Sequence, residues 1–580
     1  MTDSLNLERL TTNIIGTFIM PNDNKIQNDS DIAKQFTPQP IVDIASNLGI
    51  DSDHLMPFGK LITKIDIDAL KTKSKHPNNR LVLVSATTPT PAGEGKTTTT
   101  IGLGQAFTQL GESVCLALRE PSLGPCLGMK GGATGGGYSQ AIPVDRINLH
   151  FTGDFHAITS ANNLISATID NHVFHGNSLS IDPRQIVWRR VMDMNDRSLR
   201  KIVLGLGGKM QGIPREGGFD ITAASEIMAI LCLAENFEDL ENRLDNTLIG
   251  YSYKDQPIFL KSLKITGALL ALLRDALHPN LVQTLEGTPV FIHGGPFANI
   301  AHGCNSVLAT RMAMHHSDWA ITEAGFGFDL GAEKFFDIKC RIAELDPAAV
   351  VLVTTVRALK MHGGMDKNSS TENGIEFVKA GLDNLDKHIE NVQQFNKAPV
   401  VALNRFADDS DEEIKVIRDH VESKGILFAE SNHFSEGGKG AIELAEKVKQ
   451  AAQQSTPFKP LYDLSDSLVD KVNKVCTAMY GAKDVAYSKE AERDLQHVKK
   501  LDIEHLPICI AKAPSSLSDD PKLHGRPRDF QVTVKNIQVN AGAGFLVILT
   551  GNIMRMPGLP KEPAAKRIKL LDNGEIIGVS

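Results

Sequence analysis

The stretch of sequence that decides the fold reads Leu81-Val-Leu-Val-Ser-Ala-Thr-Thr-Pro-Thr-Pro-Ala-Gly-Glu-Gly-Lys-Thr97. Its first six residues are almost entirely apolar, as expected of a strand buried on both faces of a sheet. A glycine-containing loop follows and ends in Lys-Thr, just before a segment with helical character at 98–110. Strand, glycine loop, Lys-Thr and helix in this order form the context that a phosphate-binding P-loop requires.

The chemistry of this loop indicates a nucleotide site. Gly93 and Gly95 let backbone N–H groups point inward without crowding from a Cβ atom, and the positive N-terminus of the next helix faces the same ligand. Lys96 is expected to reach the outer phosphates and Thr97 to offer its hydroxyl to Mg2+. The pattern departs from the standard at Thr90, where glycine is usual. The residues predicted to bind ATP are Thr90, Pro91, Ala92, Gly93, Glu94, Gly95, Lys96, Thr97 and Thr98.

Alternating apolar runs and helical segments extend along the chain and predict its fold class. They are typical of an α/β fold with a mainly parallel sheet flanked by helices, in which ligands lie beyond the carboxyl ends of the strands. The predicted strands are 81–86, 114–118, 202–206, 289–292, 319–322, 350–355, 400–403, 506–511 and 545–549, and segments with helical character lie at 98–110, 221–234, 305–315 and 441–452.

Composition and charge narrow the class of protein. Of 580 residues, 42% are hydrophobic and 22% are charged, close to the globular average, which excludes a disordered, collagenous or coiled-coil chain. A formal net charge of −8 argues against nucleic acid as a main partner. Seven cysteines without a CxxC pair favour a reducing cytosol. No apolar run long enough for a membrane span and no signal peptide is visible, so a cytoplasmic protein is expected.

The length predicts three units around a shared cleft. Residues 1–365 are interpreted as a large P-loop nucleotide-binding body with an inserted subdomain. Residues 366–459 are interpreted as a second α/β domain, and residues 460–580 as a small C-terminal α/β domain. The boundaries rest on a polar, loop-like segment at 366–376 and on a segment with Gln, Ser, Thr and Pro at 453–460.

A second basic and glycine-rich cluster follows the next predicted strand. The run 114–118 ends in Arg119-Glu120, and six glycines lie within 128–137, too many for a helix or a regular strand. Arg119 is predicted to offer a bidentate guanidinium to phosphate or carboxylate. Lys130 is a further candidate phosphate contact, and Glu120 a candidate to orient a base, an ion or Arg119 itself. The alternative for this cluster is a flexible surface loop whose arginine forms a salt bridge.

The two loops together resemble signatures of the formate–tetrahydrofolate ligase family, also called 10-formyltetrahydrofolate synthetases. The similarity spans essentially the whole chain, and at 580 residues it points to the monofunctional bacterial type, with no room for the dehydrogenase–cyclohydrolase domains of eukaryotic relatives. The similar segments are 40–45, 90–98, 119–125, 128–138, 151–156, 293–303, 322–327, 353–364 and 556–560.

This resemblance implies an ATP-dependent ligation of formate to tetrahydrofolate. The expected products are 10-formyltetrahydrofolate, ADP and phosphate, with formyl phosphate as the intermediate. Lys96 and Mg2+ would neutralise the γ-phosphoryl group, and Arg119 would hold formate and then formyl phosphate. Lys96, Arg119 and Glu120 are therefore the expected catalytic residues, and Phe326 is expected near the formyl group.

The resemblance also implies where folate binds. The pterin ring is expected between Phe406 and Phe434, both in the unit 366–459. The family has Trp where Phe434 stands, and the exchange keeps an aromatic wall while losing ring area and the indole N–H. Ala407 and Thr134 replace the usual Pro and Ala. On the residues alone, core packing is the alternative for Phe406 and Phe434, and loop packing for Phe326.

Ions and partners complete these expectations. Glu120 and Asp154 are implied ligands of a monovalent cation, K+ or NH4+, and the resemblance suggests a homotetramer that takes formate and tetrahydrofolate, including its polyglutamylated forms. His293, His302, His315 and His316 lack zinc-like spacing and are interpreted as loop and core residues. Two alternatives remain: a P-loop NTPase that drives a partner protein or a metallocentre, and a non-catalytic ATP-binding scaffold. Both leave the segments 128–138 and 353–364 unexplained.

Overall fold

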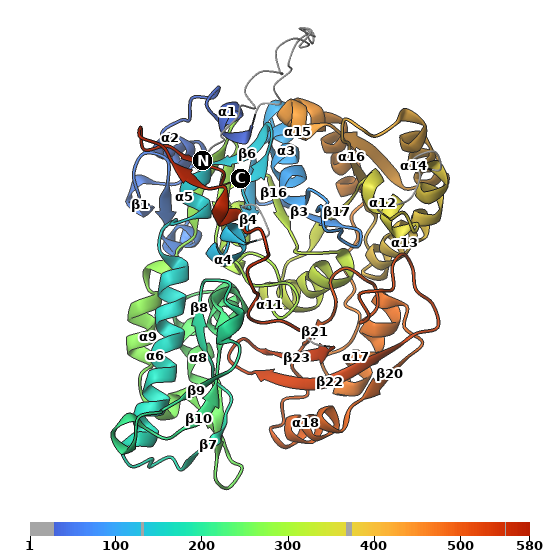
Figure 1. Cartoon of the computed structure of the whole chain (residues 1–580). Coiled ribbons are helices and arrows are strands. Elements are labelled where there is room, and N and C mark those ends of the chain that lie inside the picture. The colour runs from blue at the N-terminus through green and yellow to red at the C-terminus, as the bar shows by residue number, and fades with distance from the viewer. Residues whose placement is uncertain (1–27, 129–132, 367–373, 552, 580) are drawn as a thin grey trace, which may run out of the picture.

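A central sheet organises the computed structural model, which describes residues 28–128, 133–366, 374–551 and 553–579 (Figure 1). Within that part of the chain the sheet has twelve strands. Ten follow the order β1-β2-β14-β15-β4-β16-β3-β17-β18-β19, β6 pairs with β14, and β5 pairs with β6. All pairings from β15 to β19 are parallel, whereas those among β1, β2, β6, β14 and β15 are antiparallel. The predicted α/β class with a mainly parallel sheet is therefore confirmed.

The bounds of these strands agree with most of the predicted runs. They are β1 Leu55–Pro57, β2 Thr63–Ile65, β3 Arg80–Ala86, β4 Val114–Leu118, β5 Gly135–Gly136, β6 Ser139–Ile142, β14 Asn280–Thr284, β15 Pro289–Ile292, β16 Trp319–Glu323, β17 Pro347–Thr354, β18 Pro399–Asn404 and β19 Leu427–Ser431.

Helices cover both faces of the sheet, which explains why its strands are apolar throughout. Leu81 and Leu83 of β3 pack into the core on one face, and Val82 and Val84 into the core on the other. Successive side chains of a strand point to opposite faces, so both sets must be apolar. The helices α3 (Lys96–Gln109) and α16 (Ile442–Gln453) lie on the Val82 face, and α10 (Val307–His316), α12 (Val356–His362), α13 (Gly374–Gln394) and α14 (Asp411–Ser423) contribute to the Leu81 core.

The remaining short helices border the sheet, and several follow its strands. They are α1 Asp29–Ala33, α2 Ile41–Asn47, α4 Leu123–Leu127, α5 Val144–Asn148, α11 Arg341–Ala343 and α15 His433–Glu436. Two π-helical segments, η8 (Phe328–Ala332) and η9 (Phe335–Cys340), follow β16. Segments of this kind are frequent at functional sites.

The elements between α5 and β14 lie together below the central sheet, in teal to light green at the lower left of Figure 1. The α-helices among them are α6 Asp154–Phe174, α7 Glu226–Leu233, α8 Phe237–Asp245 and α9 Thr266–Leu273. The strands are β7 Ile181–Ile186, β8 Arg190–Met192, β9 Ile202–Leu204, β10 Arg215–Gly217, β11 Phe219–Ile221, β12 Leu248–Ser252 and β13 Pro257–Phe259.

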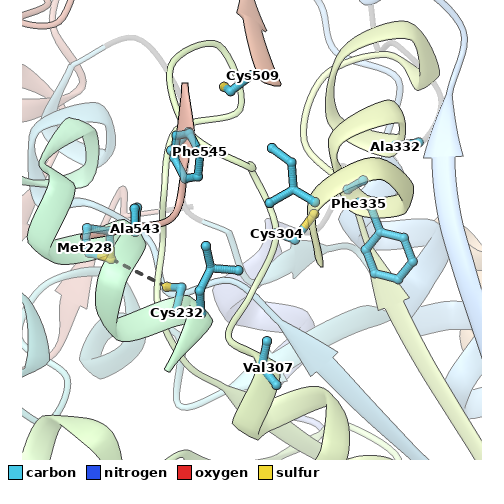
Figure 2. Close-up of a cluster of buried hydrophobic side chains, with 14 of the residues drawn as sticks. Met228, Cys232, Cys304, Val307, Ala332, Phe335, Cys509, Ala543 and Phe545 are labelled. Carbon is cyan, nitrogen blue, oxygen red and sulfur yellow. Dashed lines mark hydrogen bonds between the residues drawn. The ribbon is translucent and has the colours of Figure 1, made fainter. Parts of the chain in front are cut away.

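The C-terminal part forms a separate four-stranded sheet in the order β20-β22-β23-β21, at the lower right of Figure 1. Its elements are α17 Leu468–Val475, β20 Asp484–Tyr487, α18 Lys489–Lys500, β21 Ile508–Ala511, β22 Gln531–Asn540 and β23 Phe545–Thr550, and the hairpin β24 Lys569–Leu570 and β25 Ile576–Ile577 follows. Figure 2 shows Met228 of α7, Phe335 of η9 and Phe545 of β23 meeting in one apolar cluster. These three parts of the chain therefore share a core.

The division into three domains stays a prediction. Strands β18 and β19 hydrogen-bond into the sheet of the first unit, so the backbone of 366–459 continues that sheet, whereas the strands after residue 460 have a sheet of their own. Two predicted elements are wrong in detail. Residues 202–206 hold only β9, in a two-stranded hairpin with Val203 60% exposed, and the predicted helical segment 221–234 begins at Glu226. Both runs are apolar. No neighbouring segment among the described residues covers the first, so it stays partly exposed. In the second, Ser225 caps the N-terminus of α7, so the α-helix begins after it.

Three features of the described residues bear on the expected class of protein. No helix there has both the length and the apolar character needed to cross a membrane. No group of three or more His, Cys, Asp or Glu side chains in the same residues is arranged to hold a metal ion. All seven cysteines are buried as free thiols.

Candidate active site

The predicted P-loop connects the end of β3 to α3, and its glycines have the conformations that phosphate binding needs. Gly93 and Gly95 have φ angles of +81° and +74°, and Gly95 caps the N-terminus of α3. A Cβ atom on Gly95 would lie 2.3 Å from Asn404 Nδ2, so the position excludes larger residues for steric as well as conformational reasons. Pro91 and Ala92 form an exposed turn on the outside of the loop, and Thr98 lies half-buried in the first turn of α3.

Glu94 closes the loop from inside. Its buried carboxylate accepts a hydrogen bond from the Thr90 backbone N–H at 2.8 Å and another from the Thr355 hydroxyl at 3.0 Å. The Asn404 side-chain amide donates to the Glu94 carbonyl at 3.1 Å. The departure at Thr90 is thus accommodated, because the backbone amide of that residue has its own acceptor inside the loop.

Lys96, Thr97 and Arg119 surround one carboxylate, Glu323, which the sequence analysis did not assign. The Thr97 hydroxyl donates to Glu323 Oε2 at 2.8 Å, and Arg119 Nε lies 4.0 Å from Oε1. Loss of hydration lowers the pKa of Lys96, and the negative charges of Glu323 and Glu94 oppose that shift. An acidic residue at the end of a strand next to the P-loop strand is the usual partner of Mg2+ in such sites. The available signal was its position directly after the apolar run 319–322.

Arg119 has the geometry expected of an anion ligand. It follows β4, its side chain is 25% exposed, and its buried Nε has no hydrogen-bond partner among the described residues. Gly325 lies beneath it, since a Cβ atom there would be 2.8 Å from Arg119 Nη1. The guanidinium can therefore bind a planar anion at the carboxyl edge of the sheet by donating hydrogen bonds to it.

Phe326 follows β16 in a strained conformation. Its φ is +57°, in the left-handed region, which costs a residue with a side chain roughly 1–2 kcal/mol. Gly325 and Gly327 flank it, and the Gly325 N–H donates to the Gly303 carbonyl at 3.0 Å. Strained backbone of this kind persists only where the surroundings enforce it. It points to a function for the turn.

Glu120 and Asp154 lie side by side but differ in their partners. Lys64 Nζ donates to both oxygens of Asp154, at 2.7 and 3.0 Å, and the Asn280 amide adds a bond of 2.8 Å. Glu120 Oε2 is buried without a hydrogen-bond partner in the described residues. Burial, together with the neighbouring charge of Asp154, raises the pKa of Glu120 well above its usual range. Glu120 therefore needs a proton or a cation.

The two aromatic candidates follow neighbouring strand ends. Asn404 of β18 pairs with Ser431 of β19, and Phe406 and Phe434 come shortly after them. Phe434 is 48% exposed, with its edge 3.2 Å from where a Cβ atom on Gly136 would stand. Phe406 is half-buried, and the Arg357 guanidinium lies 4.6 Å from its ring centroid. The core-packing alternative is therefore weak for Phe434, because a core ring would not leave half its surface in water.

The glycine-rich segment after Arg119 is only partly described. Lys130 lies outside the described residues. Thr134 is buried, and its hydroxyl accepts a hydrogen bond from the Asn148 amide at 3.1 Å. Gly137 packs directly under Phe434, because a Cβ atom there would lie 2.1 Å from the Phe434 carbonyl oxygen. The glycines thus allow the loop to meet the aromatic wall closely.

Comparison with known protein families gives one match that spans nearly the whole chain. The model of the family described as formate–tetrahydrofolate ligase matches residues 27–580.

Proposed function

Because this chain belongs to the formate–tetrahydrofolate ligase family, we propose that it couples ATP cleavage to ligation through formyl phosphate. Family membership makes it an enzyme of one-carbon metabolism that joins formate to tetrahydrofolate. The proposed products are 10-formyltetrahydrofolate, ADP and phosphate. The observation that carries this proposal is the meeting of Lys96, Thr97 and Arg119 around Glu323 at the carboxyl edge of the sheet.

In the first step a formate oxygen attacks the γ-phosphoryl group of ATP and ADP leaves. Lys96 neutralises charge on the transferred group, and the Thr97 hydroxyl and Glu323 would hold Mg2+, which would supply further positive charge there. Arg119 binds formate and then formyl phosphate, so the second step starts from a bound intermediate. Glu120 follows Arg119 directly and is proposed to act beside it in catalysis.

In the second step N10 of tetrahydrofolate attacks the formyl carbon, the bond from that carbon to the phosphate oxygen breaks, and the N10 proton is lost as phosphate leaves. Phe406 and Phe434 are the proposed walls of the pterin site, because both follow the carboxyl ends of adjacent strands and Phe434 leaves its ring accessible. Phe326 is proposed to contact the formyl group. Lys130 is proposed as a further phosphate contact, and tetrahydrofolate with a polyglutamate tail is a proposed form of the substrate.

A monovalent cation, K+ or NH4+, is proposed at Glu120. The unpartnered buried oxygen of Glu120 fits such an ion, because a carboxylate without a hydrogen-bond donor is stabilised by a positive neighbour. The negative charge of Asp154 would also attract the cation, although the Asp154 oxygens already accept hydrogen bonds from Lys64 and Asn280. We further propose a cytoplasmic homotetramer, and the seven free thiols suit a reducing compartment.

The test is formation of 10-formyltetrahydrofolate from ATP, formate and tetrahydrofolate, with Lys96→Ala as the inactive control. We expect product and ADP in equal amounts from the wild type and none from the variant, with unchanged circular dichroism. ADP released without formate or tetrahydrofolate would instead favour the P-loop NTPase, and bound ATP without turnover would favour the scaffold.

A further inference from the structure

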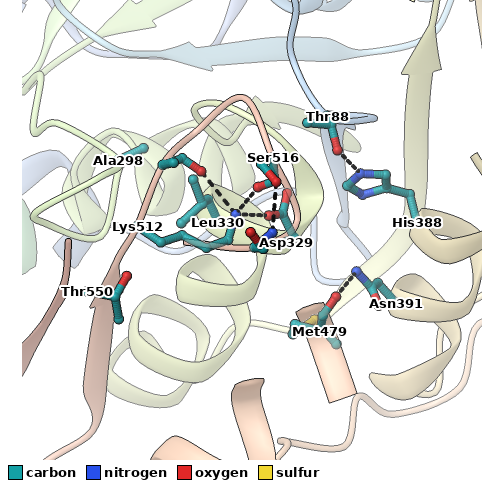
Figure 3. A network of polar contacts seen from close by, with 12 residues as sticks. Thr88, Ala298, Asp329, Leu330, His388, Asn391, Met479, Lys512, Ser516 and Thr550 are labelled. Carbon is teal, nitrogen blue, oxygen red and sulfur yellow. Dashed lines mark hydrogen bonds and ion pairs between the residues drawn. The ribbon is translucent and has the colours of Figure 1, made fainter. Parts of the chain in front are cut away.

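A buried ion pair between Asp329 and Lys512 lies next to the strained turn at Phe326. Asp329, on η8, and Lys512, which directly follows β21 of the C-terminal sheet, are both fully buried, and Lys512 Nζ lies 2.6 Å from Asp329 Oδ2 (Figure 3). No hydrogen bond from any other described residue reaches either oxygen of Asp329. The position of this carboxylate therefore depends on the C-terminal part of the chain.

The backbone between Phe326 and Asp329 is closely packed. A Cβ atom on Gly327 would lie 2.5 Å from Asp329 Oδ1, and one on Gly331 would lie 1.9 Å from the Gly325 carbonyl oxygen. The N–H groups of Leu330 and Gly331 both donate to the Gly327 carbonyl, at 3.1 and 3.0 Å. A shift of Asp329 must therefore move the backbone on both sides of Phe326.

Lys512 is itself held rigidly. Its ammonium donates to the carbonyls of Ser516 and Ala513, and it lies 4.9 Å from the ring centroid of Tyr480. Apart from Asp329, these partners all belong to the C-terminal part. Among the residues that the structure describes, Asp329 is therefore the anionic group in contact with the ammonium, and two carbonyls and a ring surround the rest of it.

The loop that follows Lys512 also reaches the base of the P-loop. The Gly525 N–H donates to His362 Nδ1 at 3.2 Å, so His362 Nε2 carries the proton that it donates to the Thr88 carbonyl at 2.9 Å. The Asn384 amide donates both to the Gly525 carbonyl, at 2.8 Å, and to the Thr88 hydroxyl, at 3.0 Å. The C-terminal part therefore contacts the supports of both the Phe326 turn and the nucleotide loop.

We infer that Lys512 is a positioning residue for the formyl-transfer site, acting through Asp329 on the turn that carries Phe326. The inference rests on the proposed function for its link to formate, because Phe326 is only proposed to contact the formyl group. Lys512 itself contacts no substrate in this scheme. The simpler reading, in which the pair only stabilises the fold, predicts no selective effect on formate.

Three variants separate the two readings. Lys512→Met removes the ammonium, and the double variant Asp329→Asn/Lys512→Met leaves no buried carboxylate alone, so it guards against simple misfolding. Lys471→Met is the matched control, because Lys471 is also fully buried in the C-terminal part but donates to the carbonyls of Glu504 and Leu506. 4-Fluorophenylalanine is incorporated into each protein for fluorine NMR. A labelled Phe326→Leu sample identifies the resonance of Phe326, because that resonance is missing from its spectrum.

We expect Lys512→Met and Lys471→Met to melt at lower temperature than the wild type and the double variant to melt closer to it. Only the two variants at Lys512 should shift or split the Phe326 line and lower kcat/KM for formate by about tenfold to a hundredfold, with the Kd for ATP within about twofold. An unchanged Phe326 line, an unchanged formate parameter, or equal effects in Lys471→Met would overturn the inference. If the wild type forms no 10-formyltetrahydrofolate, the proposed function fails, whereas the fluorine spectra still decide whether Lys512 controls the turn.

Discussion

Phe434→Ala tests the proposed folate wall, because the structure separates its two consequences. Phe434 is 48% exposed, so its truncation removes only about half of a buried phenylalanine's contribution, roughly 1–2 kcal/mol of unfolding free energy. The backbone contact is retained, since the Tyr138 N–H donates to the Phe434 carbonyl at 2.8 Å whatever the side chain. The folded enzyme should therefore survive the change.

Tetrahydrofolate binding should suffer more than stability. One aromatic face stacked on a heterocycle contributes about 1–3 kcal/mol, by analogy with bases on aromatic side chains, so affinity should fall about tenfold to a hundredfold. The assay is the Michaelis constant for tetrahydrofolate, measured beside those for ATP and formate, which should stay within about twofold. Phe434→Trp, which restores the family residue, should match or lower the wild-type constant.

Phe174→Ala is the matched control, because Phe174 is 40% exposed on α6. It should cost similar stability and leave all three constants unchanged. The reasoning would be refuted if Phe434→Ala lowered the melting temperature and left the tetrahydrofolate constant alone, or if Phe174→Ala raised that constant equally.

The other predictions concern the anion site, the P-loop and a buried acid. Arg119→Lys keeps the charge but loses the planar fork, so synthesis should drop at least tenfold while calorimetry still detects ATP binding, and an unaltered rate would reduce Arg119 to a structural role. Gly95→Ala should lower the melting temperature more than Gly93→Ala, because both have positive φ but only Gly95 adds a clash with Asn404; equal shifts would contradict this reading. Burial raises the pKa of Glu226 to about 7 from 4.5, so the folded state retains a proton that the unfolded chain loses, and stability should fall by up to about 3 kcal/mol as the pH rises from 4.5 to 7. Glu226→Gln, whose amide oxygen can still accept from the Gly542 and Ala543 N–H groups, should flatten that dependence in thermal melts at pH 5 and 8, and an unchanged slope would show that other groups dominate.

The sequence predicted those parts of the fold that depend on contiguous residues, whereas the site residues stay predictions. The strand before the P-loop and the loop itself are contiguous, so apolar runs and glycine spacing suffice to find them. The roles of Glu323 and Lys512 were not predicted, because their partners are distant in sequence; Thr97 and Glu323 are 226 positions apart. The run 202–206 holds strand β9, but the predicted burial on both faces is wrong, because an apolar run does not reveal whether other parts of the chain cover it.

The nucleotide loop and the proposed folate wall depend on the same strand end. Asn404, the last residue of β18, donates to the Glu94 carbonyl at 3.1 Å and limits the space at Gly95, and Phe406 follows two residues later. A pterin against Phe406 and a phosphate over Gly95 would thus both act on the backbone around Asn404. Glu94 also accepts hydrogen bonds from the Thr90 N–H and the Thr355 hydroxyl. A displacement of the end of β18 would therefore also move the loop around Glu94. The phosphoryl-transfer and formyl-acceptor halves of the proposed reaction therefore share one anchor, and the order of the parallel strands alone brings them together.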